Sequence, residues 1–436
     1  MQKTIKTQEM ILEKLKIAQL NPMQVEAMAA IQSQDDVVLL SPTGSGKTLA
    51  FLLPIIAALK PEIQEIQVLI LVPSRELAMQ IEQVIKEMGI GFKSMAVYGG
   101  RAGSKEKVEL KTSPTILVGT PGRVADHFRR ERLNMNHVET LVLDEFDKSL
   151  EVGFEKEMTE ILAALPIVKQ RILTSATQRI EVPAFVGINE PIKLDFLKEE
   201  ASQLVIKSVI SPEKDKLDTL VETLSHIGDK SGIVFCNFRD SIDRVSEFLK
   251  VNNISHGRFH GGMEQIDREN SLLKFRNGTH QLIVATDLAA RGLDIKGLDF
   301  IIHYQLPSRE HEFIHRNGRT ARMHSDGTAY IIIWKEEELP AFIGSLEEEE
   351  LILAPTPKPS EWRTIHINGG RRDKISKGDI AGLFFKQGQL EKEELGVIEL
   401  QREASYVGVK YKNIATLIDR LNNSKLKKKK IRLKLL

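Results

Sequence analysis

Short runs of apolar, β-branched residues alternate with stretches of helical periodicity along most of this 436-residue chain. Buried apolar strands separated by helices are typical of a parallel, doubly wound sheet. The first series of predicted strands comprises residues 36–40, 68–72, 94–98, 115–118, 140–143 and 171–174. The pattern then restarts with residues 232–236, 255–259, 281–285, 300–304 and 328–334. The chain is therefore predicted to hold two tandem α/β domains.

Two stretches of distinct composition divide the chain further. The polar residues 197–203 are the expected hinge, which places one domain at 1–197 and a second at 204–345. Residues 346–361 combine an acidic run with a proline-rich tract, as is typical of an extended linker. Residues 362–436 show the order β-α-β-β-α-β, which predicts a small ferredoxin-like sandwich of the RNA-recognition-motif (RRM) type.

Composition excludes several classes of protein. The longest uncharged apolar run, residues 49–59, is too short to span a bilayer. The single cysteine, Cys236, excludes an intramolecular disulfide and a zinc site built on cysteine pairs. The first ten residues show no apolar signal core, so a cytoplasmic setting is expected.

The net charge of +1 is distributed unevenly along the chain. Residues 360–436 hold 18 Lys and Arg against 9 Asp and Glu, whereas the other 359 residues hold 43 against 51. A basic tail on a mildly acidic body suggests a polyanionic partner for the tail. A solvated basic surface would have the same composition, so charge alone leaves both interpretations open.

The sequence SPTGSGKT at residues 41–48 lies between a predicted strand and a predicted helix. This is the context of a P-loop, in which glycines let backbone amides approach phosphate oxygens at a helix N-terminus. Lys47 is expected to reach the β- and γ-phosphates, and the Thr48 hydroxyl is expected to ligate Mg²⁺. The predicted phosphate-binding residues are Thr43, Gly44, Ser45, Gly46, Lys47 and Thr48.

Two acidic residues close the strand that ends at residue 143, about 100 residues after the P-loop. A carboxylate at that place is the Walker B position, so Asp144 is expected to hold Mg²⁺ through a bound water molecule. Glu145 is next to it and could polarise the attacking water as a general base. Two acids after a strand often form only a solvated loop, but the P-loop favours the functional interpretation.

Further motifs give the chain a resemblance to DEAD-box RNA helicases, two-domain ATPases of superfamily 2. In the first domain the matching segments are 21–24 (NPMQ), 41–48, 73–78 (PSRELA), 99–100 (GG), 120–123 (TPGR), 144–147 (DEFD) and 175–177 (SAT). In the second they are 233–237, 260–263 with Gln265 and Arg268, 285–294 (ATDLAARGLD) and 315–322 (HRNGRTAR). The resemblance implies an α/β fold with two tandem RecA-like domains.

This resemblance implies a role for each matching residue. Gln24 would hydrogen-bond the adenine, and Asp294 would contact the ribose side of ATP. Arg319 and Arg322 would act as arginine fingers that reach the γ-phosphate. The residues implied to line the RNA backbone are Arg75, Gly99, Thr120, Arg123, Gln265, Arg268 and Thr286.

Three positions depart from the family pattern. Thr7 stands where the family usually has an aromatic residue that stacks on adenine, so nucleotide affinity is expected to be reduced. Phe146 replaces the small alanine of the DEAD sequence and requires local repacking. Ser41 replaces the usual alanine at the start of the loop, with a mild expected effect.

The tail resembles the C-terminal RNA-binding domain of the DbpA type in segments 373–380, 406–409 and 425–436 (KLKKKKIRLKLL). This implies binding to a hairpin of large-subunit ribosomal RNA, with a pre-ribosomal particle as a further candidate partner. Tyr406 could equally be an ordinary sheet residue, and the lysines could form a solubilising tail. The expected RNA contacts of the tail are Tyr406, Lys427, Lys428, Lys429 and Lys430.

The sequence therefore predicts a monomeric, ATP- and Mg²⁺-dependent RNA helicase that remodels structured RNA during large ribosomal subunit assembly. One alternative is an ATP-gated RNA clamp or scaffold with little unwinding activity, which would use the same residues. Another is a DNA translocase of the same superfamily, against which the NPMQ and SAT motifs and the RNA-type tail argue.

Overall fold

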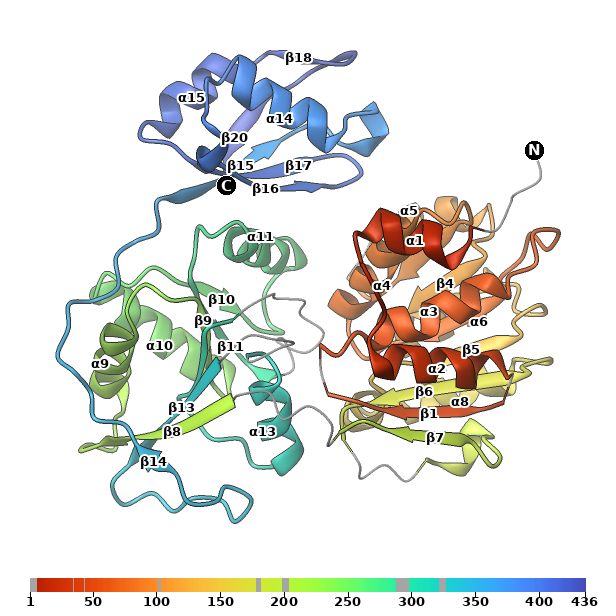
Figure 1. Ribbon diagram of the computed structural model, residues 1–436, viewed down its shortest axis with the longest axis horizontal. Coiled ribbons are helices and arrows are strands. Elements are labelled where there is room, and N and C mark those ends of the chain that lie inside the picture. The colour runs from red at the N-terminus through yellow and green to blue at the C-terminus, as the bar shows by residue number, and fades with distance from the viewer. Residues whose placement is uncertain are drawn as a thin grey trace. The chain divides into compact units, whose positions relative to one another are not determined.

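A computed structural model describes residues 6–436 except 34, 43, 101–102, 178–181, 198–203, 288–297 and 321–326. The chain forms two compact units, called unit 1 and unit 2, which divide between residues 202 and 203. Each unit holds a seven-stranded parallel sheet, and unit 2 also holds a small antiparallel sheet, which confirms the predicted fold class (Figure 1). Within the described residues, no helix is both long and apolar enough to cross a membrane.

The sheet of unit 1 is built from short apolar strands that are buried on both faces. Its order is β3-β4-β2-β5-β6-β1-β7, and all neighbouring strands are parallel. Val37 and Leu39 pack into one hydrophobic cluster and Val38 into another, because successive side chains point to opposite faces. The strands are β1 (Val37–Leu40), β2 (Val68–Leu71), β3 (Ser94–Val97), β4 (Ile116–Gly119), β5 (Thr140–Leu143), β6 (Gln170–Ser175) and β7 (Ile192–Asp195).

Helices of unit 1 cover both faces of this sheet. Residues of α2, α3 and α4 pack into the first cluster, and residues of α6, α7 and α8 pack into the second. The helices are α1 (Gln8–Leu15), α2 (Pro22–Gln32), α3 (Lys47–Ala57), α4 (Arg75–Met88), α5 (Gly103–Leu110), α6 (Pro121–Arg129), α7 (Phe146–Glu151), α8 (Glu155–Ala163) and the short 3₁₀ helix η1 (Ala184–Val186).

Unit 2 repeats this architecture with the order β10-β11-β9-β12-β13-β8-β14. The strands are β8 (Leu204–Ser211), β9 (Gly232–Phe235), β10 (Gly257–Phe259), β11 (Leu282–Ala285), β12 (Phe300–His303), β13 (Gly327–Trp334) and β14 (Glu347–Glu348). The helices are α9 (Leu217–Ile227), α10 (Arg239–Val251), α11 (Gln265–Arg276) and α13 (Glu310–Asn317). Strand for strand, the order is the same as in unit 1.

Strands β7, β8 and β14 have no counterpart among the predicted strands. Strand β14 pairs in parallel with β8, so the expected linker 346–361 begins inside the second sheet. Glu349 then forms an ion pair with Lys207 and lies 3.0 Å from the imidazole of His226. The first residues of the expected linker therefore extend the sheet of unit 2.

The tail has the predicted order β-α-β-β-α-β, with one addition. Its sheet order is β16-β17-β15-β20, with antiparallel neighbours, and the two helices pack on one face of it. A short hairpin, β18 and β19, precedes the last strand and contains the run of lysines. The elements are β15 (Trp362–Ile367), α14 (Lys377–Lys386), β16 (Leu395–Leu400), β17 (Ser405–Lys410), α15 (Ile414–Leu421), β18 (Lys425–Leu426), β19 (Lys429–Lys430) and β20 (Leu433–Leu435).

The other face of the tail sheet contacts the C-terminal end of α11. The hydroxyl oxygens of Thr279 and Thr364 are 2.7 Å apart, and Arg276 Nη1 lies 3.3 Å from a carboxylate oxygen of Glu399. Tyr406 lies on the same face and is only 7% exposed. Because Tyr406 is buried, it does not present an open surface on which a base could stack.

Candidate nucleotide and RNA sites

The turn between β1 and α3 has the conformation that a phosphate-binding loop needs. Gly44 and Gly46 have φ angles of +86° and +90°, in the left-handed region that favours glycine. A Cβ on Gly46 would also lie 2.4 Å from the side-chain nitrogen of Gln24. Gly46 directly precedes α3, so the positive end of that helix faces the loop.

Lys47 is buried and held by the carbonyls of its own loop. Its ammonium group donates to the carbonyl of Ser41 at 2.5 Å and to that of Pro42 at 2.8 Å. The Ser41 hydroxyl donates to the Ser45 hydroxyl at 2.5 Å, so the serine at the start of the loop helps to fix its shape. Thr43 lies outside the described residues.

Gln24 ties the first turn of α2 to the phosphate-binding loop. Its Oε1 accepts from the Asn21 amide at 3.0 Å, and its Nε2 donates to the Gly46 carbonyl at 3.2 Å. The Asn21 side chain donates to the Ser45 carbonyl at 2.9 Å and caps the helix. The adenine contact expected of Gln24 stays a prediction, and the structure adds a role in shaping the loop.

The carboxylate of Asp144 lies in a buried site directly after β5. It accepts hydrogen bonds from the Thr174 hydroxyl and from the Glu145 amide, the latter at 3.1 Å. Burial raises the pKa of Asp144, while the Thr174 hydrogen bond and the charge of Lys47 act in the opposite direction. The charge of Lys47 therefore favours the ionised form of Asp144.

Glu145 has a φ of +48°, which is uncommon for a residue other than glycine. Such backbone strain gathers at functional sites, where the surroundings enforce it. Phe146 follows as the first residue of α7 and is fully buried in the cluster on that face of the sheet. The large ring is therefore accommodated in the core. Asp147 accepts from the Thr177 hydroxyl at 3.2 Å, which joins the DEFD and SAT segments.

The donor set of this site fits a divalent cation with few protein ligands. Within the described residues, no three His, Cys, Asp or Glu side chains gather as a metal cage. Mg²⁺ commonly uses one or two carboxylates and completes its octahedron with phosphate oxygens and water. Asp144 supplies a buried carboxylate, and Thr48 supplies a hydroxyl in the first turn of α3.

Arg316 is a buried arginine that connects several segments of unit 2, and the sequence analysis assigned it no role. The guanidinium of Arg316 donates to the Asp287 carboxylate at 2.6 and 2.5 Å, to Asn237 Oδ1 at 2.7 Å and to the Gln305 carbonyl at 2.6 Å. The motif position of Arg316 is visible in the sequence, but its partners are not. Three separate motifs are therefore joined by one side chain.

The predicted arginine fingers and ribose contact lie only partly within the described chain. Arg319, three residues after the buried arginine, is 4% exposed. Arg322 and Asp294 lie outside the described residues. Their predicted roles toward ATP stay predictions.

The predicted RNA contacts of unit 1 fall into two segments. The guanidinium of Arg75 lies over the Gly99–Gly100 backbone, where a Cβ on Gly100 would be 2.5 Å from Nη1. Gly100 also has a φ of +87°, a backbone conformation that favours glycine. In the second segment, Thr120 directly precedes α6, and Arg123 lies in its first turn.

Arg123 is not presented to solvent in the way that an RNA contact would be. Its Nε and Nη2 face the Glu106 carboxylate at 2.8 and 2.7 Å, and its Nη1 faces Asp126 at 2.9 Å. In unit 2, Gln265 begins α11, and Arg268 is buried over the ring of Phe259. Thr286 directly follows β11.

Two of the four tail lysines lie within ion-pair distance of a carboxylate. Lys427 Nζ lies 2.9 Å from Asp379, and Lys429 Nζ lies 2.8 Å from Asp373. Lys428 and Lys430 are exposed on the same hairpin.

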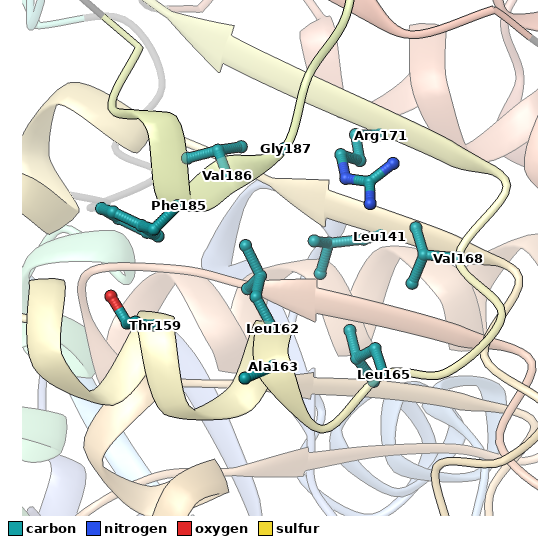
Figure 2. A pocket seen from close by; sticks show the side chains of 10 residues that line it. All are labelled: Leu141, Thr159, Leu162, Ala163, Leu165, Val168, Arg171, Phe185, Val186 and Gly187. Carbon is teal, nitrogen blue, oxygen red and sulfur yellow. The ribbon is translucent and has the colours of Figure 1, made fainter.

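A cavity of about 300 Å³ in unit 1 holds none of these residues. Its lining is apolar apart from Arg171 and Thr159, as Figure 2 shows, and α8 and η1 form part of its wall. A nucleotide would find no phosphate-binding group there except one guanidinium. The candidate nucleotide site is therefore the loop before α3 and not this cavity.

Together, the parallel sheet, the glycine loop and the buried carboxylates define a P-loop nucleotide hydrolase of the RecA-like class. Residues 21–185 match the DEAD/DEAH box helicase family, residues 215–324 the helicase conserved C-terminal domain, and residues 364–435 the DbpA RNA binding domain. The chain belongs to the DEAD-box ATP-dependent RNA helicases. It is an RNA-dependent ATPase with a DbpA-type C-terminal domain.

Two bacterial relatives match nearly the whole chain. The ATP-dependent RNA helicase DbpA of Escherichia coli (strain K12) is 31% identical over 431 residues, which are 96% of this chain and 94% of that protein. DbpA of Bacillus subtilis (strain 168) is 30% identical over 439 residues, 91% of each chain.

Solved structures with RNA and nucleotide share the fold. Dbp5 of S. cerevisiae, bound to RNA and ADP BeF3, has a TM-score of 0.67 at 25% identity, over 76% of this chain and 88% of that one. Mss116p, bound to single-stranded RNA and AMP-PNP, has a TM-score of 0.68 at 25% identity, over 76% of this chain and 73% of that one.

Proposed function

We propose that this helicase remodels structured ribosomal RNA of the large subunit, as free RNA or within a pre-ribosomal particle. The observation that supports this target is the tail, a folded basic β-α-β-β-α-β domain that matches the DbpA RNA binding domain over residues 364–435. The enzyme would act as a cytoplasmic monomer. Its functional domains would be 1–197, 204–345 extended by β14, and 362–436.

The chemical step would take place at the phosphate-binding loop of unit 1. Lys47 and the amides of Gly44, Ser45 and Gly46 would bind the phosphates, with Thr43 as a further loop contact. When bound, Mg²⁺ neutralises charge on the phosphate oxygens and would be held by Thr48 and Asp144.

Glu145 would polarise the attacking water, since a carboxylate can take a proton from water that it orients. Its strained backbone fixes the side chain at the end of β5, next to Asp144. Gln24 and Asp294 would hold the adenine and ribose ends of ATP.

Unit 2 would complete the catalytic machinery through its arginines. Arg319 and Arg322 would reach the γ-phosphate when ATP and RNA are both bound. An arginine finger typically contributes about 10³–10⁵ in rate, or roughly 4–7 kcal/mol. A contribution of that size would make hydrolysis depend on RNA.

RNA would bind through its backbone to both units and through structure to the tail. Contacts to the core are proposed at Arg75, Gly99, Thr120, Gln265, Arg268 and Thr286, with Arg123 in the same segment as Thr120. Within the tail we favour Lys428 and Lys430, which are exposed, over Lys427 and Lys429, which are paired with carboxylates. Buried Tyr406 would contribute only if the tail moved away from α11.

The target is tested by ATPase stimulation with total ribosomal RNA against random-sequence RNA of equal length. The full chain is compared with residues 1–361, a truncation chosen because β14 belongs to the second sheet. We expect the full chain to prefer ribosomal RNA and the truncated chain to lose that preference. Absence of a preference in the full chain, or its persistence after truncation, would refute the proposed target.

A duplex-separation assay with the same RNAs tests the remodelling step. ATP-dependent strand release is expected, whereas ATP-dependent binding with little release would favour the clamp.

A further inference from the structure

Glu106 of α5 is a fully buried carboxylate, and in the chain it lies between the two segments of unit 1 that are proposed to contact RNA. A buried carboxylate is tolerated when it is paired and hydrogen-bonded. One oxygen, Oε2, accepts hydrogen bonds from Arg123 Nε at 2.8 Å and from His127 Nε2 at 2.8 Å, and it lies 2.7 Å from Arg123 Nη2. Glu106 therefore ties two residues of α6 to α5.

The guanidinium of Arg123 is held between two carboxylates in this arrangement. Two of its nitrogens face Glu106, and the third lies 2.9 Å from Asp126, so its side chain is only 18% exposed. An arginine held between two carboxylates has little charge left to offer a phosphate. Its position within the TPGR segment is thus better explained as a clamp on the first turn of α6.

The charge on Glu106 is maintained by its partners. Burial acts to raise the pKa of Glu106, but hydrogen bonds from His127 and Arg123 outweigh it and hold the pKa below its ordinary value. The carboxylate is therefore ionised at neutral pH, which makes the hydrogen bond from Arg123 charge-assisted and short.

We propose that Glu106 is a positioning residue for RNA binding, acting through Arg123 to fix the turn that carries Thr120. Helix α5 also follows the Gly99–Gly100 segment, over which Arg75 lies. Glu106 therefore ties α6 to a helix that lies between these two segments in the chain. This inference rests on the proposed RNA contacts of unit 1.

The test removes the negative charge of Glu106 and keeps the size of the side chain. In full-length protein, Glu106→Gln should raise the RNA concentration for half-maximal ATPase stimulation by about 10- to 100-fold, because small displacements of binding groups are costly. The RNA-free ATPase rate and the KM for ATP should stay within about twofold of wild type, since the phosphate loop is untouched. Glu109→Gln, the same change on the same helix, is the matched control and should leave the RNA requirement unchanged.

A double-mutant cycle separates positioning from a general loss of stability. If Glu106 acts through Arg123, the Glu106→Gln/Arg123→Gln variant should bind RNA no worse than Arg123→Gln alone. All variants are assayed at a temperature where their melting curves show them folded. Additive losses, an unchanged RNA requirement, or an equal fall in RNA-free ATPase would overturn the proposal.

If Glu106→Gln does not fold, Glu106→Asp decides the question, because it keeps the charge but withdraws it by one methylene. A several-fold rise in the RNA requirement supports positioning, and wild-type behaviour refutes it. Wild-type protein that no RNA stimulates would instead refute the proposed function itself. The two failures are therefore distinguishable.

Discussion

Units 1 and 2 have the same strand order, yet the loops that follow their equivalent strands β1 and β8 differ. In unit 1, β1 leads through SPTGSGKT into α3, and in unit 2 the equivalent strand β8 leads through SPEKDK, residues 211–216, into α9. Both connections begin with Ser-Pro and contain a lysine before or at the first helical residue. The second contains no glycine, so it lacks the residues that readily turn backbone amides toward an anion.

The two lysines show what this difference does. Lys47 donates to two carbonyls of its own loop, beside the buried Asp144. Lys216 is also buried, but it donates to the Ile332 carbonyl of β13 at 2.8 Å and pairs with Glu337 at 3.0 Å. Lys47 is held within the loop that is proposed to bind phosphate, whereas Lys216 links α9 to a strand of the sheet. The fold supplies the position, and the loop chemistry decides whether that position binds phosphate.

The largest expected effect comes from replacing Lys47 by alanine, and the corresponding replacement of Lys216 provides the comparison. Lys47→Ala should reduce RNA-stimulated ATP hydrolysis to background, because it removes the ligand of the β- and γ-phosphates. Lys216→Ala should keep activity within about twofold but lower the free energy of unfolding by about 1–3 kcal/mol, since it leaves a buried carbonyl unpaired. Steady-state ATPase and chemical denaturation measure the two effects. Loss of ATPase in both variants would show that unit 2 also contributes a phosphate-binding lysine.

A slightly smaller effect is expected at Arg319, the proposed arginine finger of unit 2. Arg319→Ala should lower RNA-stimulated kcat by about 10³–10⁵, while ATP affinity without RNA stays near wild type. The exposed Arg309, before α13 in the same unit, provides a control whose replacement should change neither quantity. Nucleotide titration and single-turnover hydrolysis distinguish these outcomes. An equal loss of RNA-free ATP affinity would mean that Arg319 is not a finger.

Glu145→Gln should have the next largest effect. Removal of the base is expected to lower kcat by about 10²–10⁴, with ATP and RNA still bound, because the phosphate cradle is intact. Glu155→Gln, an exposed change at the start of α8, is the control. Binding of ATP and RNA is measured together with single-turnover hydrolysis. Near wild-type turnover by Glu145→Gln would exclude it as the base.

The sequence was sufficient for the central strands and for the motifs of the nucleotide site. Central strands such as β2 and β9 are buried along their whole length, so their apolar runs are unambiguous. Strands β7 and β14 lie at sheet edges and carry exposed charged residues, such as the two glutamates of β14. Because these strands are not continuous apolar runs, a search for such runs does not find them. Strand β8 is only half-buried.

The roles of charged residues were harder to predict than the motifs that contain them. Arg123 lies in an RNA-contacting motif, but the structure pairs it with Glu106, 17 residues earlier in the chain. Lys427 belongs to a basic run in the β18–β19 hairpin, but its partner Asp379 lies on helix α14. The sequence shows which side chains are charged. Whether such a side chain is free to bind RNA depends on tertiary contacts, which no local sequence pattern contains.

The smallest expected effect tests the same contrast in the tail, between a lysine that is paired with a carboxylate and one that is exposed. Lys428 is exposed, whereas Lys429 holds the pKa of Asp373 below its ordinary value through a hydrogen bond and its charge. Lys428→Ala should therefore weaken RNA binding several-fold and flatten the salt dependence by about 0.7 per lost single-strand phosphate contact. Because Lys429 is paired with Asp373, we expect a different response from Lys429→Ala.

Lys429→Ala should change the salt slope less than Lys428→Ala, because its ammonium is already neutralised by Asp373. The depressed pKa of Asp373 stabilises the folded tail above the ordinary aspartate pKa, and that stability is lost as the pH falls through the lower, folded-state value. Lys429→Ala should therefore weaken the tail near neutral pH and make its stability less sensitive to acid. RNA titrations at several salt concentrations and melting curves between about pH 3 and 7 measure both responses. If both variants lose RNA affinity and salt slope equally, the ion pair opens when RNA binds, and all lysines of the hairpin serve the nucleic acid alike.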